Sequence, residues 1–183
     1  MVKTVAHTTM SFDGRTVGPN GEMDWVFEGA GPNPVIDEFV PTVGAILMGR
    51  RTYGYARSTP DTDGPETQRP YGGAWNGPII VLTHEPPAIQ VAGVRFFTGE
   101  LGDAVAIASA AAGEGRCVAV FGSDIARQCM EAGLLDEVLV HVAPVMLGAG
   151  TRFFDHLDLP ARLRLIDVSA AGETVNLRYE IVR

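Results

Sequence analysis

Short apolar runs alternate along this chain with segments of helical periodicity. Three continuous apolar runs, at 44–48, 79–83 and 117–121, are typical of strands covered on both faces. The C-terminus alternates on either side of Gly172-Glu173, over 164–170 and 174–182, which predicts an antiparallel hairpin. The remaining expected elements are strands at 2–9, 94–97 and 137–142 and helices at 34–43, 50–57, 101–112 and 124–131.

Strands that alternate with helices indicate a mainly parallel sheet with helices on both faces, and the final hairpin makes the sheet mixed. The chain has 183 residues, of which 46% are hydrophobic, enough for one core. We therefore expect a single α/β domain over residues 1–183, with three layers in the order αβα. The segment 58–77 is rich in proline and in glycine pairs and is expected to be a long surface loop, a kind of segment that often carries function.

Charge and composition exclude several classes of function. The net charge of −8 argues against a binder of nucleic acid or of anionic membranes, because both polymers are negative. No apolar run reaches the ~20 residues that a membrane-spanning helix needs, and no signal-peptide core is visible, so we expect a cytoplasmic protein. The two cysteines and four histidines show no metal-ligand spacing, so no metal site is expected.

The chemistry that the sequence does suggest lies where three apolar strands end. Met48 to Tyr53 joins a strand end, a glycine and a helix start with two arginines. Leu82 to His84 places a hydroxyl and an imidazole at the next strand end, and Phe121 to Ile125 repeats the order of strand, glycine and helix. In parallel sheets, ligands bind at the carboxyl ends of strands, and helix N-termini attract phosphate. Three such ends in one chain favour a dinucleotide ligand.

These same stretches resemble the dihydrofolate-reductase-like superfamily. MGRRTY (48–53) is similar to the cofactor-binding stretch of dihydrofolate reductases, and IIVLTH (79–84) is similar to their next strand. MSFDGRTVG (10–18) and the segment from Gly122 to Phe154 resemble the reductase domain of bifunctional riboflavin-biosynthesis deaminase-reductases. The resemblance spans nearly the whole chain and implies a dihydrofolate-reductase-like fold and a reductase that uses NADPH.

Carried over position by position, the resemblance implies a set of cofactor-binding residues. The cofactor phosphates would be held by Gly49, Arg50, Arg51 and Thr52, and the adenosine end would be lined by Leu82, Thr83 and His84. The pyrophosphate and nicotinamide would lie beside Gly122, Ser123, Asp124 and Ile125, with Trp25 near the cofactor. For Trp25, an ordinary partly buried aromatic is an equal alternative.

The chain also departs from both families. Dihydrofolate reductases have two adjacent glycines where this chain has Phe121-Gly122, and their pterin-binding carboxylate has no match at the same helix position. The riboflavin reductases hold their substrate partly with a glutamate where this chain has Val120. The resemblance therefore assigns this chain neither the dihydrofolate reductase activity nor the riboflavin reductase activity. The candidate proton donors for a reduction are Asp13, Asp24, Asp37 and Glu38, with Asp37 favoured, although each is also explained as a turn or surface charge.

Three functions stay open at this point. The first is an NADPH-dependent reductase of a small polar heterocycle or carbonyl compound of unknown identity. The second is a dihydrofolate reductase or the pyrimidinone reductase of riboflavin synthesis, and the third is a non-catalytic nucleotide-binding protein. The apolar stretch from Gly133 to Phe154 permits a homodimer, which the resemblance implies.

Overall fold

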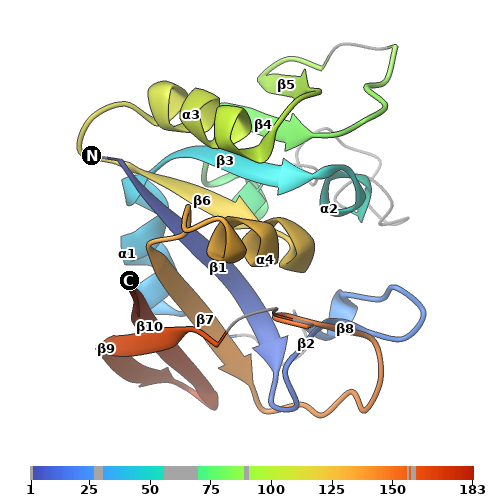
Figure 1. Cartoon of the computed structure of the whole chain (residues 1–183). Coiled ribbons are helices and arrows are strands. Elements are labelled where there is room, and N and C mark those ends of the chain that lie inside the picture. Colours follow the sequence, from blue (N-terminus) through green and yellow to red (C-terminus); the bar gives the residue numbers. More distant parts are fainter. Residues whose placement is uncertain (1, 27–30, 56–69, 89–90, 156, 158–159) are drawn as a thin grey trace. The chain divides into compact units, whose positions relative to one another are not determined.

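The computed structural model describes residues 2–26, 31–55, 70–88, 91–155, 157 and 160–183 (Figure 1). Its contacts divide the chain into two compact units. Unit 1 comprises Met1–Thr4 and Ile36–Phe121, and unit 2 comprises Val5–Val35 and Gly122–Arg183. Both units are therefore built from segments distant in sequence. The expectation of one domain over the whole chain stays a prediction.

Unit 1 is built on four parallel strands in the order β5-β4-β3-β6. Its elements are β3 (Val43–Gly49), α2 (Arg50–Tyr55), a 3-10 turn (Pro70–Gly73), β4 (Ile79–Leu82), β5 (Val94–Phe97), α3 (Leu101–Ala112) and β6 (Cys117–Phe121). All residues of β3 except the last are buried, as expected for a central strand with side chains packed on both faces. Helix α3 packs on β3, β4 and β6 and buries Ala104, Val105, Ala108 and Ala112.

Close packing in unit 1 depends on a glycine in β3. A Cβ atom at Gly44 would collide with the backbone of Ala112 at the end of α3, so only glycine allows the helix to approach the strand this closely. On the neighbouring residue, the Val43 carbonyl accepts a 2.8 Å hydrogen bond from the buried indole nitrogen of Trp75. These contacts fix the frame from which the strand ends emerge.

Unit 2 is built on β1, β7, β10 and β9, in that order. Its elements are β1 (Lys3–Ser11, from Val5 onward in this unit), β2 (Arg15–Val17), a 3-10 turn (Asp24–Val26), α4 (Ser123–Glu131), β7 (Glu137–Ala143), β8 (Thr151–Arg152), β9 (Arg162–Ala171) and β10 (Thr174–Val182). Strands β1 and β7 are parallel, whereas β10 is antiparallel to both β7 and β9. Strands β2 and β8 form a separate small sheet. Taken over both units, strand pairing is mainly parallel with an antiparallel C-terminal hairpin, as predicted.

The expected strands and helices are mostly found, with several corrections. The predicted helix 34–43 is shorter: α1 spans Pro34–Phe39, and a 3-10 turn follows over Val40–Thr42. Pro41 explains this, because it has no N–H group to continue the helix. The predicted helix 50–57 is described as far as Tyr55; residues 56–57, and 58–69 of the expected loop, lie outside the described residues. Strands β2 and β8 were missed, since two or three residues carry no readable periodicity.

The helices of this chain are short. Helix α3, one of the longer ones, has 12 residues, whereas a helix that spans a bilayer needs about 20. Among the helices described, none combines the length and apolar character needed to cross a bilayer.

Candidate functional site

The carboxyl ends of three strands lie side by side in unit 1. Met48 near the end of β3 pairs with Phe121 at the end of β6, and Gly49 pairs with Leu82 at the end of β4. The structure therefore brings together the three strand ends that the sequence analysis singled out. What they bind stays a prediction.

Arginine and histidine side chains gather at this edge of unit 1. Arg50 and Arg51 open α2 and are exposed, and His84 is exposed just beyond β4. The Arg50 guanidinium donates a hydrogen bond to the Glu85 carbonyl, which ties the start of α2 to the turn after β4. The edge thus offers positive charge and a glycine backbone close together, a combination suited to a phosphate.

Thr83 has a mainly structural role at the same edge. Its side chain is buried, and its hydroxyl accepts a 3.1 Å hydrogen bond from the Glu85 amide. Its carbonyl accepts a 2.9 Å bond from the Thr98 hydroxyl. Thr83 therefore shapes the turn that presents His84. Thr52, in the first turn of α2, is half-buried.

In unit 2, the predicted residues at the start of α4 differ in what they offer. Gly122 has φ +91°, a backbone conformation that favours glycine, and no side chain caps the helix after it. The first amide groups of this nine-residue helix can thus face a ligand. Ser123 shares a 2.9 Å hydroxyl contact with Thr16, Asp124 pairs with Arg127 at 3.1 Å, and Ile125 is buried in the core.

Trp25 is another predicted cofactor residue of unit 2 with a notable environment. Its ring is 6% exposed, and its indole Nε1 is buried without a hydrogen-bond partner among the residues described. A buried N–H group without a partner is costly and is rare in native structures. This donor is suited to an acceptor atom of a water or a ligand.

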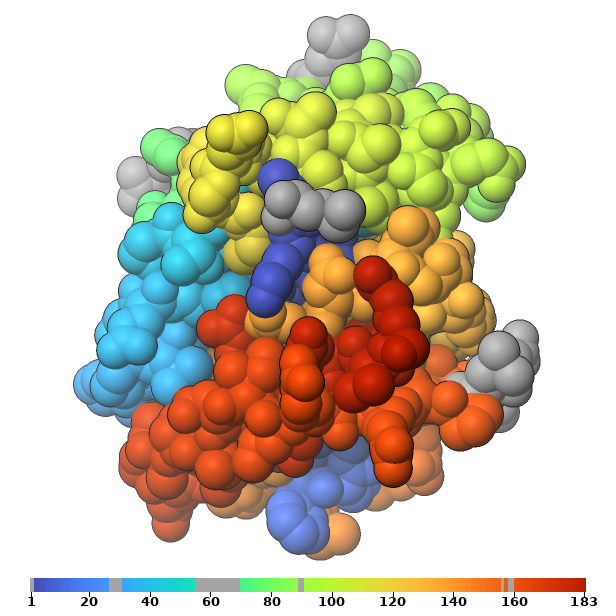
Figure 2. Space-filling view, turned by 60° about the vertical axis from the view of Figure 1, so that its left-hand side comes forward, coloured from blue at the N-terminus to red at the C-terminus, as the bar shows by residue number. Residues whose placement is uncertain are grey.

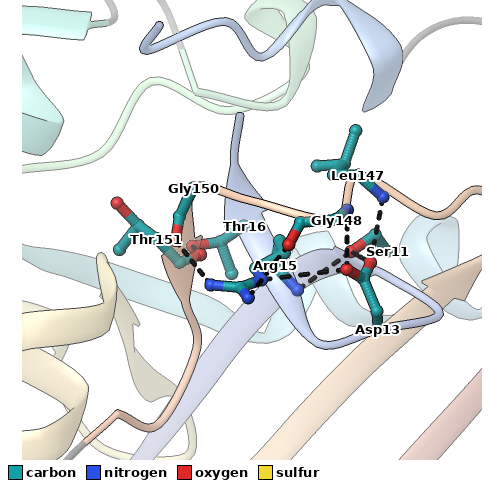
Figure 3. A network of polar contacts seen from close by, with 8 residues as sticks. All are labelled: Ser11, Asp13, Arg15, Thr16, Leu147, Gly148, Gly150 and Thr151. Atoms are coloured by element: carbon teal, nitrogen blue, oxygen red, sulfur yellow. Dashed lines mark hydrogen bonds and ion pairs between the residues drawn. The ribbon is translucent and has the colours of Figure 1, made fainter. Parts of the chain in front are cut away.

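Asp13 fastens two loops of unit 2 (Figure 3). Its carboxylate accepts hydrogen bonds from the Ser11 hydroxyl at 2.7 Å and from the amides of Leu147 and Gly148 at 3.0 and 2.8 Å. Next to it, Arg15 donates to the Gly150 carbonyl at 2.7 Å. The hydroxyl of Ser11 and the two amides lower the pKa of Asp13 to about 2. A carboxyl group that stays ionised at neutral pH is a poor proton donor, so these contacts favour a structural role.

We expect Asp13→Asn to weaken the protein at pH 5 and above but to have little effect near pH 2. The folded-state pKa lies below the ordinary value of 3.8, so the stabilisation is present above pH 4 and is lost as the pH falls toward 2. Urea unfolding of both proteins between pH 5 and pH 2 tests this. A difference between the two proteins that does not shrink on acidification would contradict it.

The other candidate acids face solvent. Asp24 is exposed in the 3-10 turn that it opens, and Asp37 and Glu38 are exposed on α1. Their assignment as proton donors stays a prediction.

A buried polar network of unit 2 was missed by the sequence analysis. His7 on β1 and His141 on β7 meet with their Nε2 atoms 2.7 Å apart, and both side chains are buried. Nδ1 of His141 lies 2.6 Å from Oδ1 of Asn176, which also accepts a 2.8 Å bond from the Asn33 amide. This pattern fits His141 protonated at Nδ1 and His7 donating from Nε2. Burial lowers the pKa of both imidazoles, and the neighbouring His141 lowers the pKa of His7 further.

One sequence signal could have found this network. His7 and His141 occupy alternating positions of two predicted strands, on the same side as buried neighbours such as Val5 and Leu139. A polar residue at a core position of a strand calls for a partner. The partner could not be named, because it depends on the pairing of strands more than 130 residues apart.

The fold defines a dihydrofolate-reductase-like α/β protein. Dihydrofolate reductase from Enterococcus faecalis, solved with NADP(H) and RAB-propyl, superposes with a TM-score of 0.65 at 19% identity, covering 98% of this chain and 96% of that one. A Shewanella sp. PV-4 protein named for riboflavin biosynthesis superposes with a TM-score of 0.81 at 21% identity over the full length of both chains. At these identities the likeness shows the fold alone.

The chain belongs to the RibD C-terminal domain family, whose model matches residues 2–177. The uncharacterized protein YwjB of Bacillus subtilis (strain 168) is 28% identical over 183 residues, which covers 97% of each chain. RibD from Acinetobacter baumannii superposes with a TM-score of 0.66 at 18% identity, and this chain spans 59% of its length. Membership of this reductase family suggests an oxidoreductase.

Proposed function

We propose that this protein is an NADPH-dependent reductase of a small polar heterocycle or carbonyl compound. The observation that carries the proposal is the edge of unit 1, where the ends of β3, β4 and β6 meet beside Arg50, Arg51 and His84. A phosphate group on the adenosine ribose distinguishes NADPH from NADH, and arginine forks are suited to bind it. Family membership supports the reductase class.

The residues of both units fit parts of such a cofactor. In unit 1, Gly49 leaves room for a phosphate to approach the backbone, with Arg51 and His84 exposed nearby. In unit 2, the start of α4 after Gly122 has no side-chain cap and suits an anionic group. The buried Trp25 indole N–H has no acceptor among the described residues and can donate to the cofactor. Each feature supports a nucleotide ligand on its own.

Bound NADPH would supply the hydride, and the protein would supply position, charge and a proton. Arg50, already bonded to the Glu85 carbonyl, would hold the turn after β4 in place, while Arg51 would neutralise the phosphate and His84 would contact it. The proton can come from Asp37, Glu38 or a bound water; the exposure of both carboxylates favours water. Val120 occupies the position of the substrate-binding glutamate, which counts against the riboflavin reaction as the alternative.

We expect NADPH to bind more tightly than NADH, and Arg50→Ala/Arg51→Ala to lose about tenfold in NADPH affinity, or ~1.4 kcal/mol. The affinity for NADH should change less, because it lacks the extra phosphate. Titration of nucleotide fluorescence measures both constants. The matched control is Arg95→Ala, which removes an exposed arginine from β5 of the same unit.

Three outcomes separate the candidate functions. Absence of binding by either nucleotide refutes the reductase proposal. Steady NADPH oxidation with dihydrofolate or with the riboflavin pyrimidinone would establish one of the named pathway activities instead. Tight NADPH binding without turnover across a broad panel of heterocycles and carbonyl compounds would favour the non-catalytic nucleotide-binding protein.

A further inference from the structure

Tyr71 has an unusual backbone conformation in the described part of the loop expected over 58–77. Among the residues that the structure describes, it is the one non-glycine residue with a positive φ, at φ 59° and ψ 35°. In this left-handed region a Cβ atom crowds the neighbouring backbone, which costs energy that glycine avoids. Gly72 and Gly73 follow with φ 61° and 86°. Strain of this kind is concentrated at functional sites, where a side chain must be held in one position.

The chain after Tyr71 is fastened to the sheet of unit 1. The Ala74 amide donates a 3.1 Å hydrogen bond to the Tyr71 carbonyl. At the next residue, the buried Trp75 indole donates to the Val43 carbonyl at the start of β3. These two contacts hold Tyr71 in place before any ligand arrives, and a side chain that is ordered in advance loses less entropy when a ligand binds.

The ring of Tyr71 lies against the end of β6. It meets the Phe121 ring nearly edge to face, with 5.6 Å between the ring centroids and 75° between the ring planes. Phe121 pairs with Met48, the residue before Gly49, so both rings lie at the strand ends where the nucleotide is proposed to bind. Both side chains are half-buried, so part of each remains accessible to a ligand.

The strand ends of unit 1 thus have a charged part and an aromatic part. Arg50, Arg51 and His84 lie just beyond β3 and β4, whereas the two rings lie at β6, on the other side of β3 from β4. Burial, and to a lesser extent Cys117, raises the pKa of the Tyr71 phenol, so this ring is uncharged at neutral pH. The charged part suits a phosphate. The aromatic part suits a planar conjugated ring, which can stack on one side chain and meet the other with its edge.

We propose that Tyr71 and Phe121 contact the substrate of the reductase and make it specific for a planar conjugated heterocycle over an acyclic carbonyl compound. The inference rests on the proposed function and narrows its two substrate classes to one. Hydride transfer requires the substrate to lie beside the nicotinamide, which is at the opposite end of NADPH from the adenosine phosphate. The substrate therefore belongs away from the cations. An acyclic carbonyl compound has no ring face to stack on either side chain.

Ligand binding to the full-length protein saturated with NADP⁺ tests the proposal without knowledge of the natural substrate. The probes are quinoxalin-2-one and quinazolin-4-one, which are planar heterocycles, and acetoin, an acyclic carbonyl compound. Titration followed by saturation-transfer NMR gives each dissociation constant. We expect both heterocycles to bind about tenfold more tightly than acetoin, or better.

Replacements of Tyr71 separate the ring from the backbone strain. Tyr71→Leu should weaken binding of both heterocycles by about tenfold, because it removes the ring but keeps a Cβ atom in the same conformation. Tyr71→Phe keeps the ring and should bind them within about threefold of the wild type. The affinity for NADPH, from nucleotide fluorescence, should be unchanged in both variants. A purely structural role of Tyr71 would not single out the heterocycles.

The matched control is Phe96→Leu, which removes a ring from another edge-to-face pair of unit 1. Phe96 of β5 packs against Tyr53 with 5.2 Å between the ring centroids. Two strands separate β5 from β6 in the sheet, and Figure 2 shows the light-green to yellow segment that includes β5 and α3 at the surface. We expect Phe96→Leu to bind the heterocycles as the wild type does.

Folding of each variant is checked by circular dichroism and thermal unfolding. If Tyr71→Leu is not folded, Tyr71→Asn takes its place, because asparagine tolerates the left-handed region and has no aromatic ring. Heterocycle affinity that is unchanged in the folded variant overturns the proposal, as does a wild-type protein that binds NADPH but neither heterocycle, or acetoin equally well. A parallel loss of NADPH affinity also overturns it, since the rings would then contact the cofactor. A wild-type protein that binds no nucleotide refutes the reductase proposal itself, and this inference with it.

Discussion

Acidification below pH 6.5 should destabilise this protein steeply, and the buried His7–His141 pair should account for much of the loss. The two Nε2 atoms, 2.7 Å apart, can share a hydrogen bond only while at least one is unprotonated. Burial lowers the pKa of both imidazoles below 6.5. Below pH 6.5, these two imidazoles therefore bind protons in the unfolded chain but stay neutral in the folded protein until their lower pKa values are reached.

The sign of the effect follows from this difference. Above pH 6.5 the two imidazoles are neutral in both the folded and the unfolded protein, so their protonation does not change the free energy of unfolding. As the pH falls below 6.5, each histidine removes up to ~1.4 kcal/mol of unfolding free energy per pH unit until its folded-state pKa is reached. The other charged side chains on these strands are Lys3 of β1, the ion-paired Glu137 and Arg178, and Arg162, Arg164, Asp167 and Glu180 of the hairpin.

Urea unfolding at several values between pH 7.5 and pH 5 measures this slope. In His7→Gln/His141→Gln, we expect a lower stability at pH 7.5, because the network is disrupted, but a clearly flatter decline toward pH 5. His84→Gln is the control, since it removes an exposed histidine of unit 1 that lies outside the buried network. The explanation fails if the double variant declines as steeply as the wild type.

Removing the partner of Glu137 should give the second large effect. Glu137 is 1% exposed, and its Oε2 atom lies 2.6 and 2.8 Å from two guanidinium nitrogens of Arg178. In Arg178→Met the carboxylate keeps its burial but loses this cation. Breaking a buried pair in this way costs about 3–5 kcal/mol, and the partial exposure of Arg178 places our expectation near 3 kcal/mol.

Denaturant unfolding at neutral pH measures this loss. Glu137→Gln/Arg178→Met should recover part of the stability, because a neutral amide is cheaper to bury than a carboxylate that has lost this cation. Arg164→Met is the control: its pair with Glu180 is largely exposed and should contribute less than about 1 kcal/mol. Equal losses in Arg178→Met and Arg164→Met would show that burial of Glu137 has no special role.

Local sequence patterns were enough to predict most elements. Strand β5, helix α3 and strand β6 have the predicted bounds, because each is a clear apolar or helical run ended by a glycine or polar turn. The helix from Pro34 was predicted too long, because the prediction did not take into account that Pro41 has no N–H group for an α-helical hydrogen bond. The order of strands within each unit could not be predicted, because it depends on contacts between distant segments.

The candidate site likewise has residues that the sequence could identify and residues whose role depends on distant contacts. A glycine at a strand end followed by arginines is a local pattern, and it identified Gly49, Arg50 and Arg51 as one group. The role of Asp13 could not be predicted, because its hydrogen-bond donors Leu147 and Gly148 lie more than 130 residues away in sequence. The loops then make Asp13 a structural residue, although its motif suggested a candidate acid.

The sequence by itself determined the α/β class, the hairpin and the residue types at the three strand ends, since these depend on periodicity and on neighbours within a few residues. Only the tertiary structure decided that His7 meets His141, that Arg178 neutralises Glu137, and that one side of the hairpin stays apolar and exposed. The physical reason is strand register. Pairing decides which side chains share a face, and a shift of one residue would place each of them on the other side of the sheet.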